Sequence, residues 1–275
     1  MAITVRTNIA ANNAITNLNK TSRALSRNFE RISTGLRIAR SADDAAGQGV
    51  ADKLRSLHRS ADQAARNIND GISMIGVADG AASEVSSILT RLRELAVQSS
   101  SETLADTERS YIQDETTQLV SEIDRISAVT EFDGVKLSDG SVTQVAVQVG
   151  VRNTSNDRIT VLLGDLTATN GLAVNSIDLS TASNAQSAID TIDTAIGTVN
   201  QVRSLYGAVE NRLGNALNNI ETFSEANKTG ESRIRDADFG VETAALTQNQ
   251  ILQQAGVSIL AQAKSLNQSA LSLLQ

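Results

Sequence analysis

The 275-residue sequence contains no cysteine, no proline and no tryptophan, and its only histidine is His58. The absence of cysteine excludes disulfide bonds and thiolate chemistry. Because proline interrupts a helix more strongly than any other residue, its absence permits long unbroken helices. Two tyrosines and four phenylalanines are the only aromatic residues. A hydrophobic core must therefore be built mainly from Ala, Ile, Leu and Val.

The residue patterns of common catalytic and metal sites are also missing. His58 begins the string "HRSAD", which lacks the HExxH spacing of zinc proteases. One histidine without cysteine does not supply the ligands that transition-metal sites normally use. The string "GQGVAD" at residues 47–52 follows no predicted strand, and Asp43 and Asp44 are interpreted as residues that complement the dipole at a helix start. We therefore expect a protein that is not an enzyme and binds neither cofactor nor metal.

Long apolar runs are absent, and so is a strong excess of basic charge. No run approaches the ~18 residues of a membrane-spanning helix, and "MAITVRTNIAANNAITN" lacks the pattern of a cleaved secretory signal. We expect no membrane insertion.

The net charge of −7 is uneven: residues 1–43 hold seven basic and two acidic residues, which leaves −12 for the remainder. Without alternating basic and aromatic residues, we also expect no nucleic acid partner.

Both ends of the chain carry a coiled-coil pattern with alternating steps of three and four residues. Its N-terminal positions are Ile15, Leu18, Ser22, Leu25, Phe29, Ile32 and Leu36. Its C-terminal positions are Leu252, Gly256, Ile259, Ala263, Leu266, Ala270 and Leu273. Because small and large residues alternate in the second set, a partner helix could approach closely. We predict that the two ends pair with each other as helices.

Such a helix pair buries little apolar area against the conformational entropy that its ordering costs. Many Asn, Gln, Ser and Thr residues lie beside the apolar positions. We therefore predict that both ends are loose in the free chain and become ordered only on association.

The middle of the chain contains further helical patterns and one β region. Apolar residues at helical spacing predict a long helix from Leu54 to Ala96, and a second helix that begins near Asp106 or Thr107 and ends near residue 129. The string "FDGVKLSDGS" indicates turns. "VTQVAVQVG" and "DRITVLLG", separated by "VRNTSN", predict a β-hairpin.

The remaining residues before the C-terminal end divide into an irregular part and a helical part. Residues 165–180 are interpreted as polar and irregular. Helical spacing returns at Ile189 and continues to Phe223, and "EANKTGES" at residues 225–232 is predicted to interrupt it.

These patterns predict a mainly α fold. It is an elongated antiparallel helical rod or coiled coil with a small β-hairpin region, and both termini pair as helices. Residues 1–44 and 235–275 are predicted to be the two halves of a terminal helical domain. Residues 45–180 are predicted to contain the first long helices and the β region. Residues 181–234 are predicted to form the later long helix.

The string "LTRLRELAVQSS" at residues 89–100 carries two stripes at helical spacing. Leu89, Leu92 and Ala96 form an ordinary core stripe. The second stripe consists of Arg91, Leu95 and Gln98 and is half apolar. A helix with two such stripes needs two neighbours. We predict that the first stripe packs within the chain and that Arg91 and Leu95 face a second neighbour.

The sequence resembles bacterial flagellin over nearly its whole length. The N-terminal string is "NIAANNAITNLNKTSRALSRNFERISTGLRIARSADDAAGQGVADKL", followed by "RNINDGISMIGVADGA" and "RLRELAVQSS". The C-terminal strings are "GAVENRL", "SRIRDADF", "ILQQAGVSILAQA" and "ALSLLQ". Leu266, where many relatives have proline, and Thr90, where a common relative has glutamine, depart from the pattern. The short stretch between the predicted helix that ends near residue 129 and the later long helix at residues 181–234 resembles flagellins that lack outer variable domains.

The resemblance implies a structural subunit that polymerises into the bacterial flagellar filament for swimming motility. In this family the two chain ends form a helical pair in the filament core. The implied partners are further copies of the chain, an export chaperone, the type III export apparatus, the filament cap and hook-junction proteins. The implied location is secreted and extracellular. A hook–filament junction protein is the alternative, and a generic coiled-coil scaffold would not need the β-hairpin.

The resemblance also implies recognition by innate immune receptors. The residues that match those read by the Toll-like flagellin receptor are Arg91, Leu95 and Glu115, with Gln98 on the same surface. The C-terminal leucines that match those read by cytosolic sensors are Leu271, Leu273 and Leu274. These residues are therefore expected on surfaces that meet other subunits or a receptor.

Overall fold

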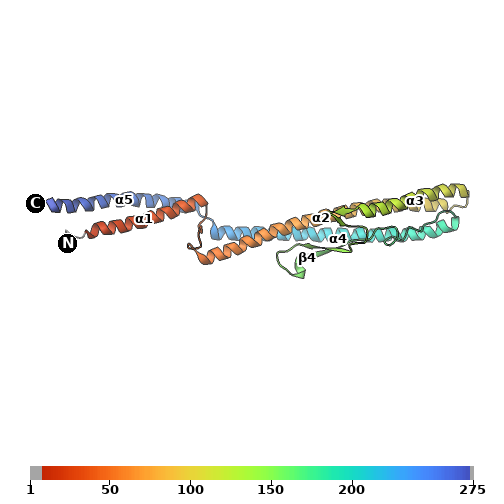
Figure 1. The fold of residues 1–275 in the computed structure, drawn as a ribbon, viewed down its shortest axis with the longest axis horizontal. Coiled ribbons are helices and arrows are strands. Elements are labelled where there is room, and N and C mark those ends of the chain that lie inside the picture. Colours follow the sequence, from red (N-terminus) through yellow and green to blue (C-terminus); the bar gives the residue numbers. More distant parts are fainter. Residues whose placement is uncertain (1–7, 273–275) are drawn as a thin grey trace. The chain divides into compact units, whose positions relative to one another are not determined.

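A computed structural model describes the backbone of residues 8–272 and the side chains of residues 8–265. Within these residues the chain forms five α-helices, α1 to α5, and four short strands, β1 to β4, with a single 3₁₀ turn at Ser155–Asp157 (Figure 1). The contacts divide the chain into two compact units. We call residues 1–57 with 226–275 the terminal unit, and residues 58–225 the central unit.

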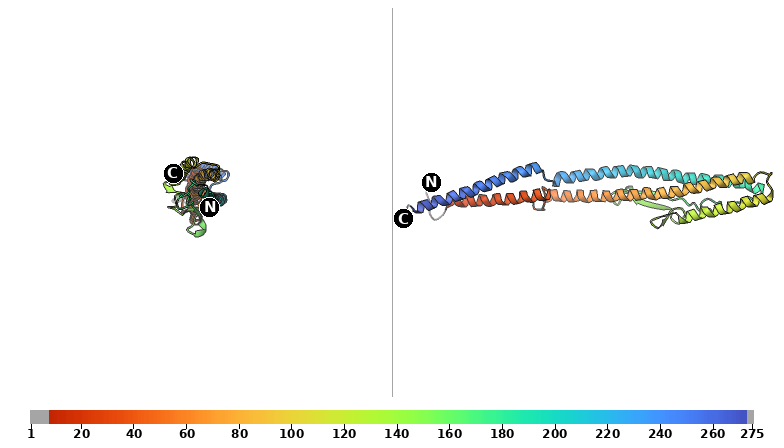
Figure 2. Two further views of the ribbon diagram at one scale, coloured as in Figure 1. Left: turned by 90° about the vertical axis from the view of Figure 1, so that its right-hand side faces the viewer. Right: turned by 90° about the horizontal axis from the view of Figure 1, so that it is seen from above.

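In the terminal unit, α1 (Ile9–Thr34) and α5 (Phe239–Ser272) lie side by side and antiparallel (Figures 1 and 2). The Asn8 side chain caps the start of α1 by accepting a hydrogen bond from the Ala11 N–H. The helix ends at Gly35, whose φ of 71° is a left-handed conformation that favours glycine. The predicted pairing of the two chain ends as helices is thus confirmed.

Three further helices are α2 (Ala45–Ser99), α3 (Asp106–Val129) and α4 (Ala182–Arg235). The helices predicted in these regions are confirmed, although the N-cap position of α3 is Ala105, whose backbone N–H donates to the Glu108 carboxylate, and not Asp106 or Thr107. The predicted interruption at residues 225–232 is wrong, because α4 continues through it. A side chain built at Gly230 would lie 3.3 Å from Leu54 Cδ1, so close packing on α2 outweighs the weak helix propensity of this stretch.

The β region contains two antiparallel pairs. β1 (Glu131–Phe132) pairs with β2 (Val135–Lys136) across Asp133 and Gly134, whose φ values are 48° and 78°. Two positive φ angles in an Asp-Gly turn are the geometry that a tight hairpin requires. β3 (Gln144–Gln148) pairs with β4 (Arg158–Leu162), which confirms the predicted hairpin.

The central unit contains two hydrophobic cores. One joins α2, α3 and α4 to residues 166–179, and the other joins α2 and α4 to the β3–β4 hairpin. Residues 165–180 form neither helix nor strand, as predicted, but their description as polar is wrong: Leu166, Leu172, Val174 and Leu179 are buried. Side chains of α3 bind this backbone, since Asp124 accepts from the Ala168 N–H and Gln113 from the Leu179 N–H.

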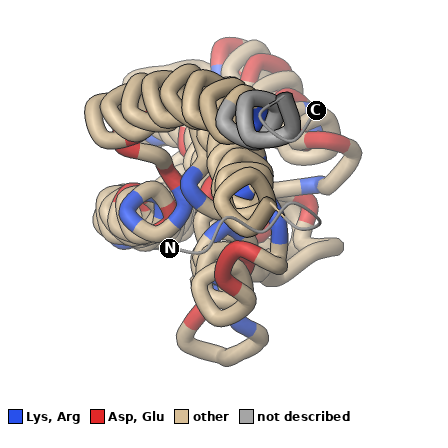
Figure 3. The backbone as a smooth tube through the Cα atoms, turned by 90° about the vertical axis from the view of Figure 1, so that its left-hand side faces the viewer, with Lys and Arg blue, Asp and Glu red and all other residues tan. Residues whose placement is uncertain are grey.

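Helix α2 contains an 18-residue window with mean hydropathy 1.2, which is sufficient by length and composition for a membrane span. This is weak evidence, because core helices of soluble folds pass the same test. Ile68, Ile75 and Leu89 of α2 are buried in the two cores of the central unit. Basic and acidic residues both occur along the described backbone (Figure 3).

Candidate assembly interface

Three contacts at different points along the helix pair fix the antiparallel register of α1 and α5. Arg31 Nη1 lies 3.0 Å from Glu242 Oε1, and Glu242 is buried. Leu18 Cδ1 lies 3.4 Å from the position that a Cβ would take at Gly256, so the absence of a side chain there lets α1 approach. The Asn8 side-chain amide donates to the Ala263 carbonyl at 2.9 Å. One ion pair, one close approach and one hydrogen bond thus hold the pair.

The structure divides the side chains predicted to pair α1 with α5 into two groups. Leu18, Leu25 and Ile32 are half-buried, whereas the other four described members are 40–55% exposed. These four are Ile15, Phe29, Leu252 and Ile259. For them pairing within one chain stays a prediction.

Small and polar residues also take part in the contact between α1 and α5. Ala11 and Asn28 are the buried residues of α1, and Gly256 and Ala263 are among the α5 residues nearest to α1. Leu18, Gly256 and Ala263 are all predicted heptad positions, so the observed contact uses part of the predicted seam. Leu266 and Leu271 lie in α5 but their side chains are outside the described residues, as are Leu273 and Leu274 altogether.

Large apolar side chains remain exposed on the terminal unit along both helices. We define the tail surface as the exposed apolar residues of α1 and α5. They are Ile9, Ile15, Phe29, Phe239, Val241, Ile251, Leu252, Val257 and Ile259. The exposed apolar side chains of the tail surface are candidates for protein–protein contact.

A second predicted surface lies at Arg91 of α2. Its guanidinium binds Glu115 of α3 at 2.9 Å and Glu94 at 3.1 Å. The hydrogen bonds that Arg91 donates to Glu115 and Glu94 raise the pKa of Arg91, so its guanidinium stays charged between the two carboxylates. Arg91, Gln98 and Glu115 are exposed. The structure therefore brings Arg91 and Glu115 together on an accessible face.

Leu95 does not belong to this accessible face. Its side chain is 2% exposed and packs in the core between α2, α3 and α4. The prediction that Leu95 faces another subunit is therefore wrong for this structure. The stripe of Arg91, Leu95 and Gln98 does have a neighbour of its own, as its pattern required. That neighbour is α3 of the same chain, which folds back along α2.

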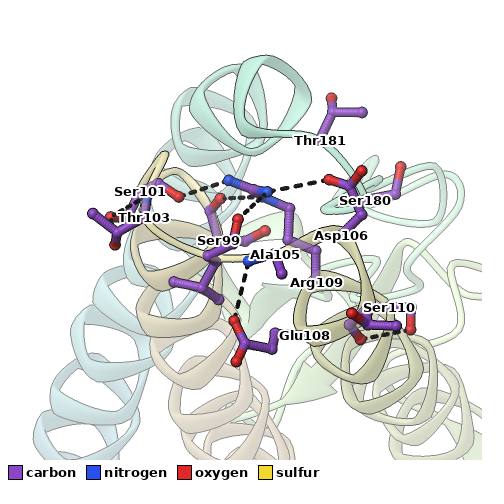
Figure 4. Close-up of polar contacts among 12 residues, drawn as sticks. Ser99, Ser101, Thr103, Ala105, Asp106, Glu108, Arg109, Ser110, Ser180 and Thr181 are labelled. Atoms are coloured by element: carbon purple, nitrogen blue, oxygen red, sulfur yellow. Dashed lines mark hydrogen bonds and ion pairs between the residues drawn. The ribbon is translucent and has the colours of Figure 1, made fainter.

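The turn between α2 and α3 is held by Arg109, which the sequence analysis missed (Figure 4). The guanidinium is buried and donates to the carbonyls of Ser99 (3.1 Å), Ser101 (2.6 Å) and Leu104 (2.8 Å). The Ser99 hydroxyl donates to the Leu179 carbonyl at 2.6 Å. An arginine in the first turn of a helix that follows a serine-rich turn was the available signal. By fixing the start of α3, Arg109 positions Glu115 opposite Arg91.

Comparison with known proteins gives consistent results. The model of the bacterial flagellin N-terminal helical region matches residues 5–143, and that of the bacterial flagellin C-terminal helical region matches residues 189–274. A flagellin of Halalkalibacterium halodurans is 44% identical over 259 residues, which cover 94% of this chain and 93% of the relative. A flagellin of Bacillus subtilis is 38% identical over 299 residues and covers 98% of each chain.

A solved structure agrees with these sequence relatives. The crystal structure of Bacillus cereus flagellin superimposes with a TM-score of 0.50 at 31% identity, and the match covers 56% of this chain and 88% of that one. Sequence relatives along nearly the entire length and a matching helical fold point to the same family. The chain therefore belongs to the bacterial flagellin family.

Proposed function

We propose that the chain, which as a flagellin is a structural subunit of the bacterial flagellar filament, polymerises by burying its tail surface against α1 and α5 of neighbouring copies. The observation that carries this proposal is the exposure of large apolar side chains along both helices, Phe29 and Ile259 among them. Burying one such side chain contributes about 1.5–3 kcal/mol. A few of them suffice to drive association.

The tail surface also suits an open polymer. It includes residues on two different helices, so one copy can present its α1 face to the α5 face of the next. Contacts between two different patches generate a helical filament when the rotation between copies does not close a ring. The proposed assembly is therefore heterologous.

The proposal includes ordering of α1 and α5 on assembly. Within one chain, α1 buries only Ala11 and Asn28, and an isolated helix pair with so little buried surface does not offset the entropy of ordering. Burial of the tail surface between copies supplies the missing stabilisation. Assembly would then be coupled to folding of the chain ends.

The experiment uses charge substitutions with matched controls. Purified protein is dissociated by heat, cooled, and analysed by electron microscopy and sedimentation. Phe29→Asp and Ile259→Asp are expected to raise the concentration needed for filaments by on the order of tenfold or more, because a carboxylate would be buried. The controls Asn19→Asp and Gln254→Asp place the same charge at exposed polar positions of α1 and α5. Equal filament yield in all four variants would overturn the proposal.

The same images distinguish the alternative. A hook–filament junction protein would form short rings, whereas a filament subunit grows into long polymers. The relatives named flagellin match over nearly the full chain, which favours the filament subunit.

Further partners are proposed from the family resemblance. The export chaperone and the type III export apparatus would meet α5 before assembly, and the cap and hook-junction proteins would meet the two ends of the filament. The exposed cluster of Arg91, Gln98 and Glu115 is the part of the predicted receptor surface that a Toll-like flagellin receptor could reach. Binding of purified monomer to the receptor ectodomain, compared with Glu115→Ala, tests this proposal.

A further inference from the structure

A cavity of about 830 Å³ lies in the central unit between the β3–β4 hairpin and α4. Its apolar wall includes Ile159 of β4 and Ile220 and Phe223 of α4. Arg152 and Arg158 from the hairpin and Arg212 from α4 also line it. The cavity therefore combines an apolar wall with three guanidinium groups.

Arg158 in this cavity is held by uncharged partners. Arg158 donates to Gln148 Oε1 at 3.1 Å and to Asn153 Oδ1 at 2.6 Å, both uncharged groups. Asp157 is the one acidic residue in the lining, and it accepts a hydrogen bond from the Thr154 hydroxyl. The cavity thus keeps a positive charge in a chain whose net charge is −7, which favours an acidic occupant.

An exposed aromatic residue with acidic neighbours lies on α3. Tyr111 is 71% exposed, more than any other large apolar residue among the described side chains. Glu108 and Asp114 precede and follow it by three residues, so they share its face of the helix, and both are exposed. We call these three residues the α3 knob. Tyrosine is enriched at the centres of protein interfaces, where its ring is buried.

The α3 knob cannot reach the cavity of its own chain. Arg91 of α2 binds Glu115 of α3, and Arg93 of α2 binds Asp193 of α4 at 2.5 Å. These two contacts place the α3 knob beside the first third of α4. Arg212 and Phe223 follow Asp193 by 19 and 30 residues. At ~1.5 Å per residue the cavity begins about 30 Å further along the unit and extends to about 45 Å.

We propose that the α3 knob of one copy inserts into the arginine-lined cavity of the next copy, an inference that rests on the proposed polymerisation. The Tyr111 ring packs on Ile220 and Phe223, and the Glu108 and Asp114 carboxylates pair with the guanidinium groups. Because knob and cavity are different surfaces of one unit, the contact is heterologous and repeats along a polymer. Contacting copies are shifted by about 30–45 Å along α4.

The first test introduces pairs of cysteines into the chain, which has no native cysteine that could form other disulfides. A Tyr111→Cys/Asn219→Cys variant places one thiol in the knob and one in the cavity lining. Mild oxidation of its filaments is expected to give a ladder of disulfide-linked oligomers on a non-reducing gel, and oxidation of its dilute monomer is expected to give none. The single-cysteine variants and Tyr111→Cys/Glu84→Cys, with the second thiol on the exposed side of α2, are the controls. Filaments without a specific ladder would overturn the inference.

The second test exchanges charges between the knob and the cavity. It tests the knob contact even if the cysteine variant does not polymerise. Asp114→Arg and Arg212→Asp are each expected to raise the critical concentration about two- to fivefold, and the two changes combined are expected to restore it. Tyr111→Ser is expected to raise it about tenfold. Absence of recovery in the combined variant would contradict the contact. If the unmodified chain forms no filaments, the proposed function fails. If it does and these variants match it, only the knob contact fails.

Discussion

The hydroxyl oxygen of Tyr206 on α4 accepts a hydrogen bond from the backbone N–H of Gly164, 3.1 Å away, just after β4. Tyr206 is the largest fully buried side chain among the described residues. Its ring belongs to the core that joins the hairpin to α2 and α4. This contact therefore fixes the end of the hairpin to α4.

The contact predicts a loss of stability at alkaline pH. Burial is the main cause that raises the pKa of Tyr206, so the folded state favours the neutral phenol. The unfolded chain ionises first, near pH 10, so the stabilisation is complete below pH 10 and is lost as pH rises through the higher folded-state pKa. Thermal melts between pH 9 and 11.5 should show this fall.

The control for this prediction is a pair of phenylalanine variants. Tyr206→Phe should lose about 1 kcal/mol at neutral pH, because the Gly164 N–H loses its acceptor, and its melting temperature should fall less steeply above pH 10. Tyr111→Phe retains Tyr206 and should follow the unmodified chain. Parallel curves for both variants would refute the assignment.

Replacing Leu95 should destabilise the monomer, in contrast to what an exposed position would show. Leu95→Ala removes a buried side chain from the core and should cost about 2–5 kcal/mol. Val97→Ala, at a half-exposed position two residues away, should cost much less. Urea denaturation of the monomer measures both. A small and equal effect at the two positions would show that Leu95 is not buried in solution.

Arg109→Lys should destabilise the central unit although it keeps the charge. A lysine ammonium cannot reach three carbonyls in the fork geometry of a guanidinium, and a buried carbonyl that loses its donor costs about 1–3 kcal/mol. Arg125→Lys is the matched control, because Arg125 is exposed and pairs only with Glu122 of its own helix. Its effect should stay within about 0.5 kcal/mol. Chemical denaturation that ranks the two variants equally would contradict the role of Arg109.

Deletion of residues 252–275 should abolish filaments and leave a soluble helical monomer. The deletion removes much of the α5 partner of α1, whereas the two cores of the central unit remain. Electron microscopy reports filaments, and circular dichroism reports the monomer. Filaments of normal length from the truncated chain would refute the role of α5.

Helix content should increase when the monomer polymerises. The proposed coupling of folding to assembly requires that α1 and α5 gain order between copies. Circular dichroism at one concentration, before and after polymerisation, measures this gain. Identical spectra in the two states would exclude loose chain ends in the monomer.

Local periodicity predicted most of the secondary structure. The long run of apolar residues from Leu54 to Ala96 falls inside α2, and the alternation around Val145 and Val147 falls in β3. Both patterns depend on neighbours a few residues apart, which the sequence displays directly. The interruption expected at residues 225–232 failed because packing of Gly230 on Leu54 is a contact between residues distant in sequence.

The sequence by itself determined that this chain is built from long helices around a small hairpin, because the absence of proline and the apolar spacing leave few alternatives. It also determined the flagellin family, through strings that extend over both ends. Only the tertiary structure decided which face each helix uses: α3 covers Leu95, and the buried residues of α1 include the polar Asn28. The reason is that a helix with two apolar stripes specifies how many neighbours it needs, while the choice of neighbour depends on how distant segments pack.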